Sequence, residues 1–171
     1  MTAELLKEKE QLVEKLGITF EQNDHLAPVA ARILSYVVLT GDSGTTFEEL
    51  VEKLCASKST ISTHLNHLLD LKKIKYFRKP GDRKKYFIKN PDTIFQRIDK
   101  MIEDWSAQLD LHLEIKKYKE KMNAMSPQET EPEFNLGFHD NYIVYLKEAM
   151  SSLEKLRNKI IEIEKNKTPL Q

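Results

Sequence analysis

The chain has 171 residues, of which 32% are charged and 40% hydrophobic, and its formal net charge is zero. This composition is typical of a folded protein and excludes a fully disordered chain. No apolar run approaches the roughly 20 residues of a membrane-spanning helix, and the N-terminus lacks a signal-peptide pattern, so we expect a cytoplasmic protein without a membrane partner.

Two helices are predicted before residue 41. The first covers residues 3–16, with Leu5, Leu6, Leu12, Val13 and Leu16 on one stripe, and Gly17 is expected to stop it. Asp24 is expected to cap the second helix, which has Pro28 in its first turn and ends near Thr40. This helix is apolar nearly all round, which predicts that it lies at the centre of the core.

A helix, a tight turn and another helix are predicted between residues 46 and 72. Thr46 and Glu49 fit a capping box at the start of the first of these helices. Cys55, the single cysteine, lies in the turn and has no partner for an internal disulfide. Ser57 is expected to cap the helix after this turn, which runs to about Lys72. The side chains expected to pack this helix on the domain are Ile61, Leu65, Leu68 and Leu69.

A β-hairpin is predicted next. Residues 74–78 and 85–89 are aromatic and β-branched runs of strand length, and Pro80-Gly81 between them favours a turn. The bases around this turn are Arg78, Lys79, Arg83, Lys84 and Lys85. One alternative explanation is that they only protect an edge strand by charge.

Two long helices are predicted at the C-terminal end, over residues 92–122 and 140–165, with an exposed loop at 126–133. Apolar residues of the last helix recur in alternating steps of four and three, which is the spacing of a coiled-coil seam. The residues expected to mediate dimerisation are Leu146, Leu153, Leu156 and Ile160. An intramolecular bundle that buries the same stripe is the alternative, and the two arrangements are compatible.

Positive charge is concentrated in residues 45–90, which hold eleven Lys and Arg against five Asp and Glu. Such asymmetry within a neutral chain indicates a phosphate-binding module. The helix that Ser57 caps carries no acid before Asp70, and its exposed side chains are short and polar, which suits base edges in the major groove. The residues of this helix predicted to bind DNA are Ser57, Lys58, Ser59, Thr60, Ser62, Thr63, Asn66 and His67. In the hairpin we expect Arg83 to reach the minor groove and the other bases to contact phosphates.

The segments FEELVEKL (47–54), SKSTISTHL (57–65) and PGDRKKYF (80–87) resemble winged-helix regulators of the MarR type. Over about 24–90 the resemblance is fairly specific, and the long flanking helices look most like the GbsR branch, the glycine-betaine-synthesis repressor-like proteins. It implies a homodimeric repressor on a palindromic operator. Many relatives carry Arg where this chain has Thr63, so Lys58 or the wing would have to supply that base contact.

The resemblance also implies a small-molecule effector near the junction of the DNA-binding domain and the helices that form the dimer. A choline- or betaine-like cation would suit an aromatic cage, but packing explains the aromatic side chains more simply, and we assign no ligand. The aromatic residues considered are Tyr36, Trp105, Tyr118, Phe134, Phe138, Tyr142 and Tyr145.

The sequence therefore predicts a mainly α chain with a small β-hairpin wing. It places an N-terminal helical arm at 1–23, a winged helix-turn-helix domain at 24–90, and a helical dimerisation and effector region at 91–171. The predicted function is sequence-specific binding of double-stranded DNA by a transcriptional regulator, and the alternative is a winged-helix adaptor that binds protein. We expect neither an enzyme nor a cofactor, because the sequence has no glycine-rich phosphate loop, cysteine cluster or nucleophile motif. We expect no metal site, because His64 and His67 have no third ligand nearby in the sequence.

Overall fold

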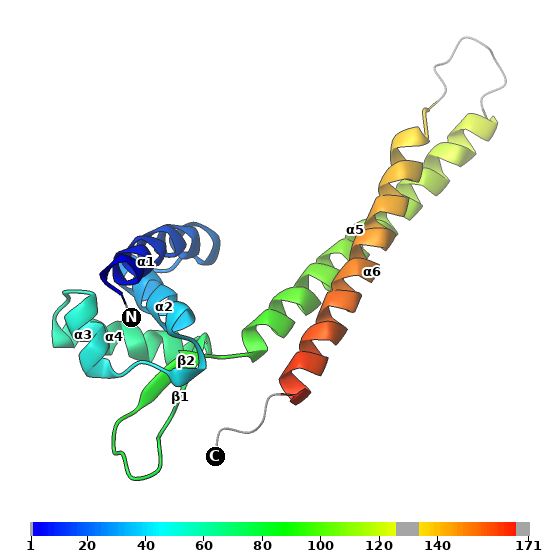
Figure 1. Cartoon of the computed structure of the whole chain (residues 1–171). Coiled ribbons are helices and arrows are strands. Elements are labelled where there is room, and N and C mark those ends of the chain that lie inside the picture. The colour runs from blue at the N-terminus through cyan, green and yellow to red at the C-terminus, as the bar shows by residue number, and fades with distance from the viewer. Residues whose placement is uncertain (1, 126–133, 167–171) are drawn as a thin grey trace. The chain divides into compact units, whose positions relative to one another are not determined.

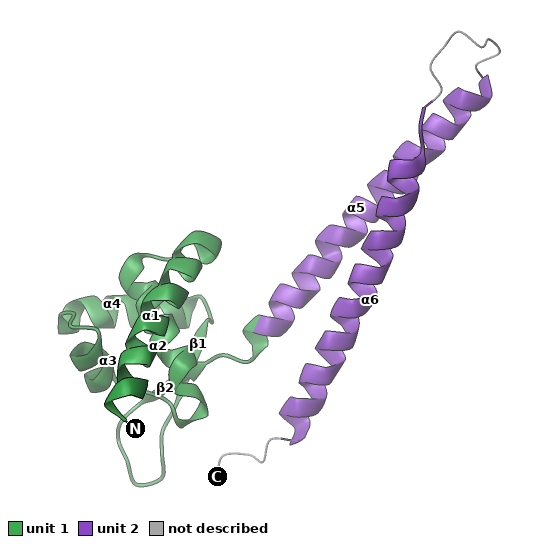
Figure 2. Cartoon of the chain, turned by 45° about the horizontal axis from the view of Figure 1, so that its top comes forward, with its two compact units in different colours: residues 1–93 green, residues 94–171 purple. Residues whose placement is uncertain are grey.

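The structure, a computed structural model, describes residues 2–125 and 134–166. The chain divides into two compact units, residues 1–93 and 94–171 (Figure 2). The elements in chain order (Figure 1) are α1 (Ala3–Asp24), α2 (Pro28–Thr40), the 3-10 helix η1 (Gly41–Ser43), α3 (Phe47–Lys53), α4 (Lys58–Asp70), β1 (Ile74–Phe77), β2 (Tyr86–Lys89), α5 (Asp92–Met125) and α6 (Gly137–Asn166). The predicted mainly α fold with a β-hairpin is confirmed, whereas the loop expected at 126–133 lies outside the described residues. None of the described helices has the length and apolar character needed to cross a membrane.

Helix α1 is longer than the sequence predicted, and Gly17 does not stop it. Gly17 is buried where α1 packs on α2, and a Cβ atom there would lie 3.3 Å from Cγ of Arg32. Its role is therefore close packing between helices, and the helix ends only at His25, which adopts a left-handed conformation. The predicted apolar stripe was wrong in part, because Val13 is buried whereas the three leucines before it, Leu5, Leu6 and Leu12, are exposed.

The prediction that Asp24 caps the second helix was also wrong. Helix α2 begins at Pro28, with Ala27 in the capping position and no side-chain hydrogen bond there. Asp24 instead ends α1 and forms an ion pair with Lys73, with 3.3 Å between the carboxylate and the ammonium. This pair links the end of α1 to the segment between α4 and β1.

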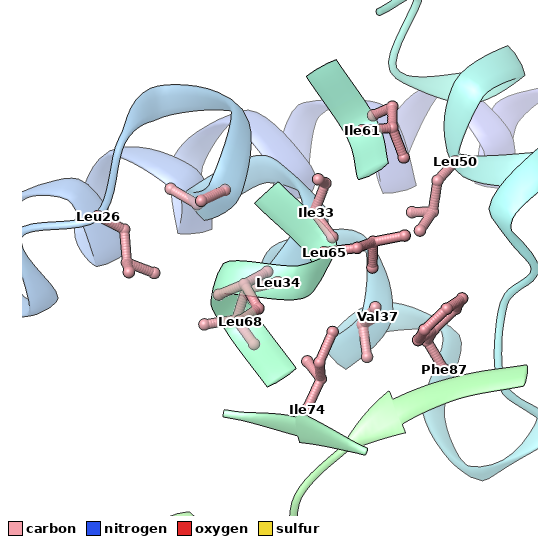
Figure 3. Packing of buried hydrophobic residues seen from close by; sticks show 12 residues of the cluster. Leu26, Ile33, Leu34, Val37, Leu50, Ile61, Leu65, Leu68, Ile74 and Phe87 are labelled. Carbon is pink, nitrogen blue, oxygen red and sulfur yellow. The ribbon is translucent and has the colours of Figure 1, made fainter. Parts of the chain in front are cut away.

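Helix α2 is the centre of the unit 1 core, as predicted. Residues 30, 31, 33, 34, 35 and 37 of this helix are buried. Figure 3 shows side chains from α2, α3, α4 and the hairpin pointing toward one another around it. The buried cluster contains Leu26, Ala30, Ala31, Ile33, Leu34, Val37, Leu50, Ile61, Leu65, Leu68, Ile74 and Phe87.

Unit 2 is a helical hairpin in which α5 and α6 lie side by side. The hydroxyl of Tyr142 donates to Oε1 of Gln108 at 2.9 Å, and Nε of Arg157 donates to Oδ1 of Asp99 at 2.7 Å. The first contact lies at the middle of α5, and the second lies nearer its N-terminal end. Helix α6 starts three residues before the predicted position, and α5 ends three residues after its predicted end.

Candidate nucleic-acid interface

Helices α3 and α4 are joined by the tight turn that a helix-turn-helix requires. The predicted capping box is present at the start of α3, because Thr46 Oγ1 accepts from the Glu49 amide and Glu49 Oε2 accepts from the Thr46 amide. Leu54 ends α3, and Cys55 then adopts a positive φ of 49°, a conformation that usually favours glycine. The backbone thereby reverses within a few residues and starts α4.

The N-terminus of α4 is built from hydroxyl side chains. Ser57 caps the helix as predicted, since its Oγ accepts from the Thr60 amide at 3.1 Å. The same oxygen lies 2.9 Å from Oγ of Ser59 and 2.7 Å from Oγ1 of Thr60. Lys58 is exposed at the first position of the helix. An exposed helix start with a lysine beside it favours a phosphate group.

The two faces of α4 separate as the sequence predicted. Ile61, Leu65 and Leu68 are buried, with Leu69 half-buried beside them. On the opposite face Ser62, Thr63, Asn66 and His67 are exposed. Oγ1 of Thr63 donates to the backbone oxygen of Ser59 at 3.0 Å.

This last hydrogen bond uses the donor of Thr63 within the helix itself. The side chains of Ser62, Asn66 and His67, by contrast, make no hydrogen bond with any other described residue. They therefore keep their donors and acceptors available for base edges, and of these Asn66 has the amide geometry for a bidentate contact with adenine.

The wing is the antiparallel hairpin of β1 and β2, in which Ile74 pairs with Lys89 and Phe77 pairs with Tyr86. The strands are each one residue shorter than predicted, so Arg78 and Lys85 lie outside the ladder. The predicted wing bases Arg78, Lys79, Arg83, Lys84 and Lys85 are all exposed. None of them forms an ion pair with a described residue. With five bases against one acid, Asp82, residues 78–85 carry a net positive charge.

A groove of about 440 Å³ lies between α4 and the wing. Ser62 and Asn66 from α4 line it together with three wing bases, Arg83, Lys84 and Lys85. Its apolar walls come from Phe47, Leu65, Leu69 and Phe87. The structure therefore brings the middle of the predicted recognition helix and the predicted wing to one concave surface. The remaining predicted residues, Ser57, Lys58, Ser59, Thr60, Thr63, His67, Arg78 and Lys79, are not among the residues that line the groove.

Two residues that the sequence did not single out fix the wing to the domain. Thr45 is fully buried and pairs with Phe87 through two backbone hydrogen bonds of 3.0 and 2.8 Å. Gly44 precedes it with a φ of 71°, and a Cβ atom there would lie 2.9 Å from Cβ of Tyr86. A side chain at position 44 would push the wing away, so the glycine permits a close approach of this loop to β2.

Two acidic residues also belong to this surface. Glu48 lines the groove from the first turn of α3, and it forms no ion pair or hydrogen bond with another described residue. Asp82 lies among the wing bases. Hydrogen bonds from the Lys84 amide and from the Tyr86 hydroxyl lower the pKa of Asp82, so it is charged at neutral pH.

The residues predicted to mediate dimerisation differ in exposure within one chain. Leu146 is 1% exposed and packs inside the helical hairpin, Leu153 and Ile160 are half-buried, and Leu156 is 47% exposed. The predicted stripe therefore contributes to the hairpin itself at its N-terminal end and leaves an apolar surface further along α6.

The described residues contain no group of three or more His, Cys, Asp or Glu side chains that could hold a metal ion. Three of the aromatic residues considered for a cage form a row on α6, since the rings of Phe138, Tyr142 and Tyr145 stack with centroids 5.5 and 5.9 Å apart. Tyr36 lies apart from that row in sequence and unit, with the ammonium of Lys9 4.0 Å above its ring.

Comparison with known proteins does not identify a family for this chain. No family model matches the chain, and no curated protein matches it. A solved structure described as "Crystal Structure of a transcriptional regulator" aligns with 22% sequence identity and a TM-score of 0.48, covering 91% of this chain and 99% of that one. The functional conclusion therefore depends on the residues of the groove.

Proposed function

We propose that this protein is a sequence-specific double-stranded DNA-binding regulator of transcription that acts as a homodimeric repressor. One observation carries the proposal: an acid-free polar helix face and a set of unpaired wing cations border a single groove. The protein acts by binding, with neither catalysis nor a cofactor.

The two sides of the groove have different tasks in this proposal. Helix α4 enters the major groove, where Ser62 and Asn66 meet base edges, and Lys58 at its start meets a phosphate. The wing lies along the neighbouring backbone, where Arg83 reaches into the minor groove and Lys84 neutralises a phosphate. Because the Thr63 hydroxyl already donates to the backbone oxygen of Ser59 within the helix, we assign base discrimination mainly to Asn66 and not to Thr63.

The proposal also includes a dimer, a palindromic operator and a small effector. A single small reading head binds one half-site weakly, and two heads about 34 Å apart read a palindrome. The apolar side chains that α6 leaves exposed, Leu156 among them, supply a reason for self-association. The likeness of the motif segments to MarR-type and GbsR-like regulators supports a repressor that responds to a small effector, whose identity we leave open.

The test is selection of bound duplexes from a random pool, followed by titration of the best duplex at several salt concentrations. We expect affinity to fall steeply with salt, because each neutralised phosphate releases counterions. Arg83→Ala should weaken binding to all duplexes and reduce the salt slope by about one. Asn66→Ala should instead reduce the preference for the selected duplex by about 1–3 kcal/mol.

Lys15→Ala is the matched control, because it removes the same charge from an exposed position on α1 and should leave affinity unchanged. Absence of duplex binding at low salt would overturn the proposal. In that case the apolar walls of the groove would favour the alternative, a winged-helix adaptor that binds a protein partner.

A further inference from the structure

The tip of the wing lacks the regular hydrogen bonding of a sheet. The β ladder ends at the pair of Phe77 and Tyr86, so residues 78–85 connect the strands without ladder hydrogen bonds. A connection of this length between two strands is mobile unless other contacts order it. Asp82 is the only acid among these eight residues, which include five bases.

The contacts that order this connection converge on Asp82. Its amide donates to the carbonyl of Lys79 at 3.0 Å, and Gly81 has a φ of 76°, which together with Pro80 fits a type II turn. Its Oδ1 accepts from the Lys84 amide at 2.9 Å, two residues further along the chain.

The other carboxylate oxygen ties the tip to the body of the domain. Oδ2 of Asp82 accepts from the Tyr86 hydroxyl at 2.7 Å. The ring of Tyr86 stacks on Phe77 with centroids 5.7 Å apart and lies under the ammonium of Lys79, and Cβ of Tyr86 borders Gly44. One carboxylate thus joins the backbone between Arg83 and Lys85 to an aromatic ring that is itself fixed on the domain.

The charge of Asp82 and its hydrogen bonds have opposite expected effects on DNA binding. An acid within a Debye length of about 8 Å of the phosphates repels them, so its removal should tighten binding to DNA. The same removal would release two hydrogen bonds to a carboxylate and free the segment that presents the wing cations. The two effects therefore differ in sign and can be separated by experiment.

We propose that Asp82, acting through Tyr86 and the Lys84 amide, is the positioning residue that holds the wing in the conformation that binds DNA. The inference rests on the proposed function for its consequence in binding, whereas the ordering of the wing is a property of the free protein. Asp82 itself contacts no phosphate in this account.

Four variants test the proposal by duplex titration. Asp82→Ala should weaken binding about tenfold despite the gain in positive charge, because two hydrogen bonds to a charged group are lost. Asp82→Asn keeps an acceptor for the Lys84 amide and a polar group for Tyr86, so it should bind as tightly as the wild type or more tightly. Tyr86→Phe, which removes one hydroxyl without changing charge, should weaken binding by about two- to fivefold.

Glu48→Gln is the matched control for charge, since it removes an acid from the same groove but breaks no wing contact, and it should tighten binding. Tighter binding by Asp82→Ala, to the same extent as by Asp82→Asn, would overturn the proposal, because only charge would then matter.

A second readout does not need DNA. Backbone ¹⁵N–¹H nuclear Overhauser effects of Arg83 and Lys84 in the free protein should be those of ordered residues in the wild type and in Asp82→Asn, and should fall in Asp82→Ala. Unchanged values in Asp82→Ala would overturn the positioning role. A wild-type protein that binds no duplex would refute the proposed function, and these relaxation data would still decide the role of Asp82.

Discussion

The two units of this chain differ in how completely they bury their own apolar side chains. Unit 1 closes a core of twelve residues from α2, α3, α4, the hairpin and the loop before α2. Unit 2 has two helices of 34 and 30 residues, yet among its described residues only Ile98, His139, Ile143 and Leu146 are buried. Long helices therefore do not form a closed core by themselves. In a pair of helices each helix covers one face of the other, and a further element is needed to cover the faces that remain.

The exposed surface of unit 2 follows from this difference. Its large exposed apolar residues are Leu111, Leu113, Tyr118, Met122, Met125, Phe134, Phe138, Val144, Tyr145, Leu156 and Ile163. So many apolar side chains on a pair of helices are typical of a surface that associates. In the proposed function, unit 1 is the DNA-binding unit and unit 2 brings two such units together.

The largest expected effect comes from breaking the core of unit 1. Ile61 is fully buried on the packed face of α4, so Ile61→Ala should lower the free energy of unfolding by about 3 kcal/mol through lost burial and a cavity. Leu71→Ala, at a site 45% exposed, should cost less than about 0.5 kcal/mol. Denaturant unfolding measures both, and equal effects would mean that unit 1 lacks the closed core described above.

The next effect concerns the surface of unit 2. Leu156 lies on the heptad stripe and is 47% exposed, so Leu156→Glu should raise the dissociation constant of the dimer by about a hundredfold while the monomer stays folded. Val144→Glu, at an exposed site off the stripe, should change it far less. Sedimentation at several concentrations measures this. A dimer that survives Leu156→Glu would place the association surface elsewhere.

The smallest effect expected is a pH dependence within unit 2. Nδ1 of His112 lies 2.9 Å from Nδ1 of His139, and Nζ of Lys119 lies 3.0 Å from Nε2 of His139. An ammonium only donates, so Nε2 of His139 accepts, and its Nδ1 carries the proton that is donated to His112. The network is complete only when both imidazoles are neutral.

Burial, then the charges of Lys119 and His112, lower the pKa of His139 below its ordinary value of 6.5, against a smaller opposing effect of Asp140. The unfolded chain therefore binds more protons than the folded one, and stability falls as pH drops below about 6.5. Melting temperatures between pH 7.5 and 5.5 should show this fall, and His139→Gln should reduce it while the exposed-site variant His67→Gln does not. A melting temperature that rises on acidification would contradict the network.

Much of unit 1 was predictable because its local signals agree with its packing. The capping box of Thr46 and Glu49 and the Ser57 cap specify where two helices begin, and the spacing of Ile61, Leu65 and Leu68 specifies the buried face of α4. One error occurred where a residue serves tertiary packing. Gly17 looks like a helix stop in the sequence, but its lack of a side chain allows Arg32 to approach.

The parts that the sequence did not predict depend on contacts between distant residues. His112 and His139 are 27 positions apart, and nothing in their local sequence indicates that they meet. The sequence shows Asp82 only as one acid among the wing bases, since its hydrogen bond to Tyr86 depends on the conformation of the whole turn. Thr45 likewise lies in a polar loop and gives no local sign of its pairing with β2.

The central claim is that the groove between α4 and the wing is the surface that meets DNA. The most direct test is to map amide chemical-shift changes of the labelled protein upon addition of the selected duplex. The account predicts that the largest changes fall on Ser62, Asn66 and residues 83–85, with the core amides of α2 little affected. Changes that are absent, or that cluster on α1 and leave α4 and the wing unaffected, would contradict it.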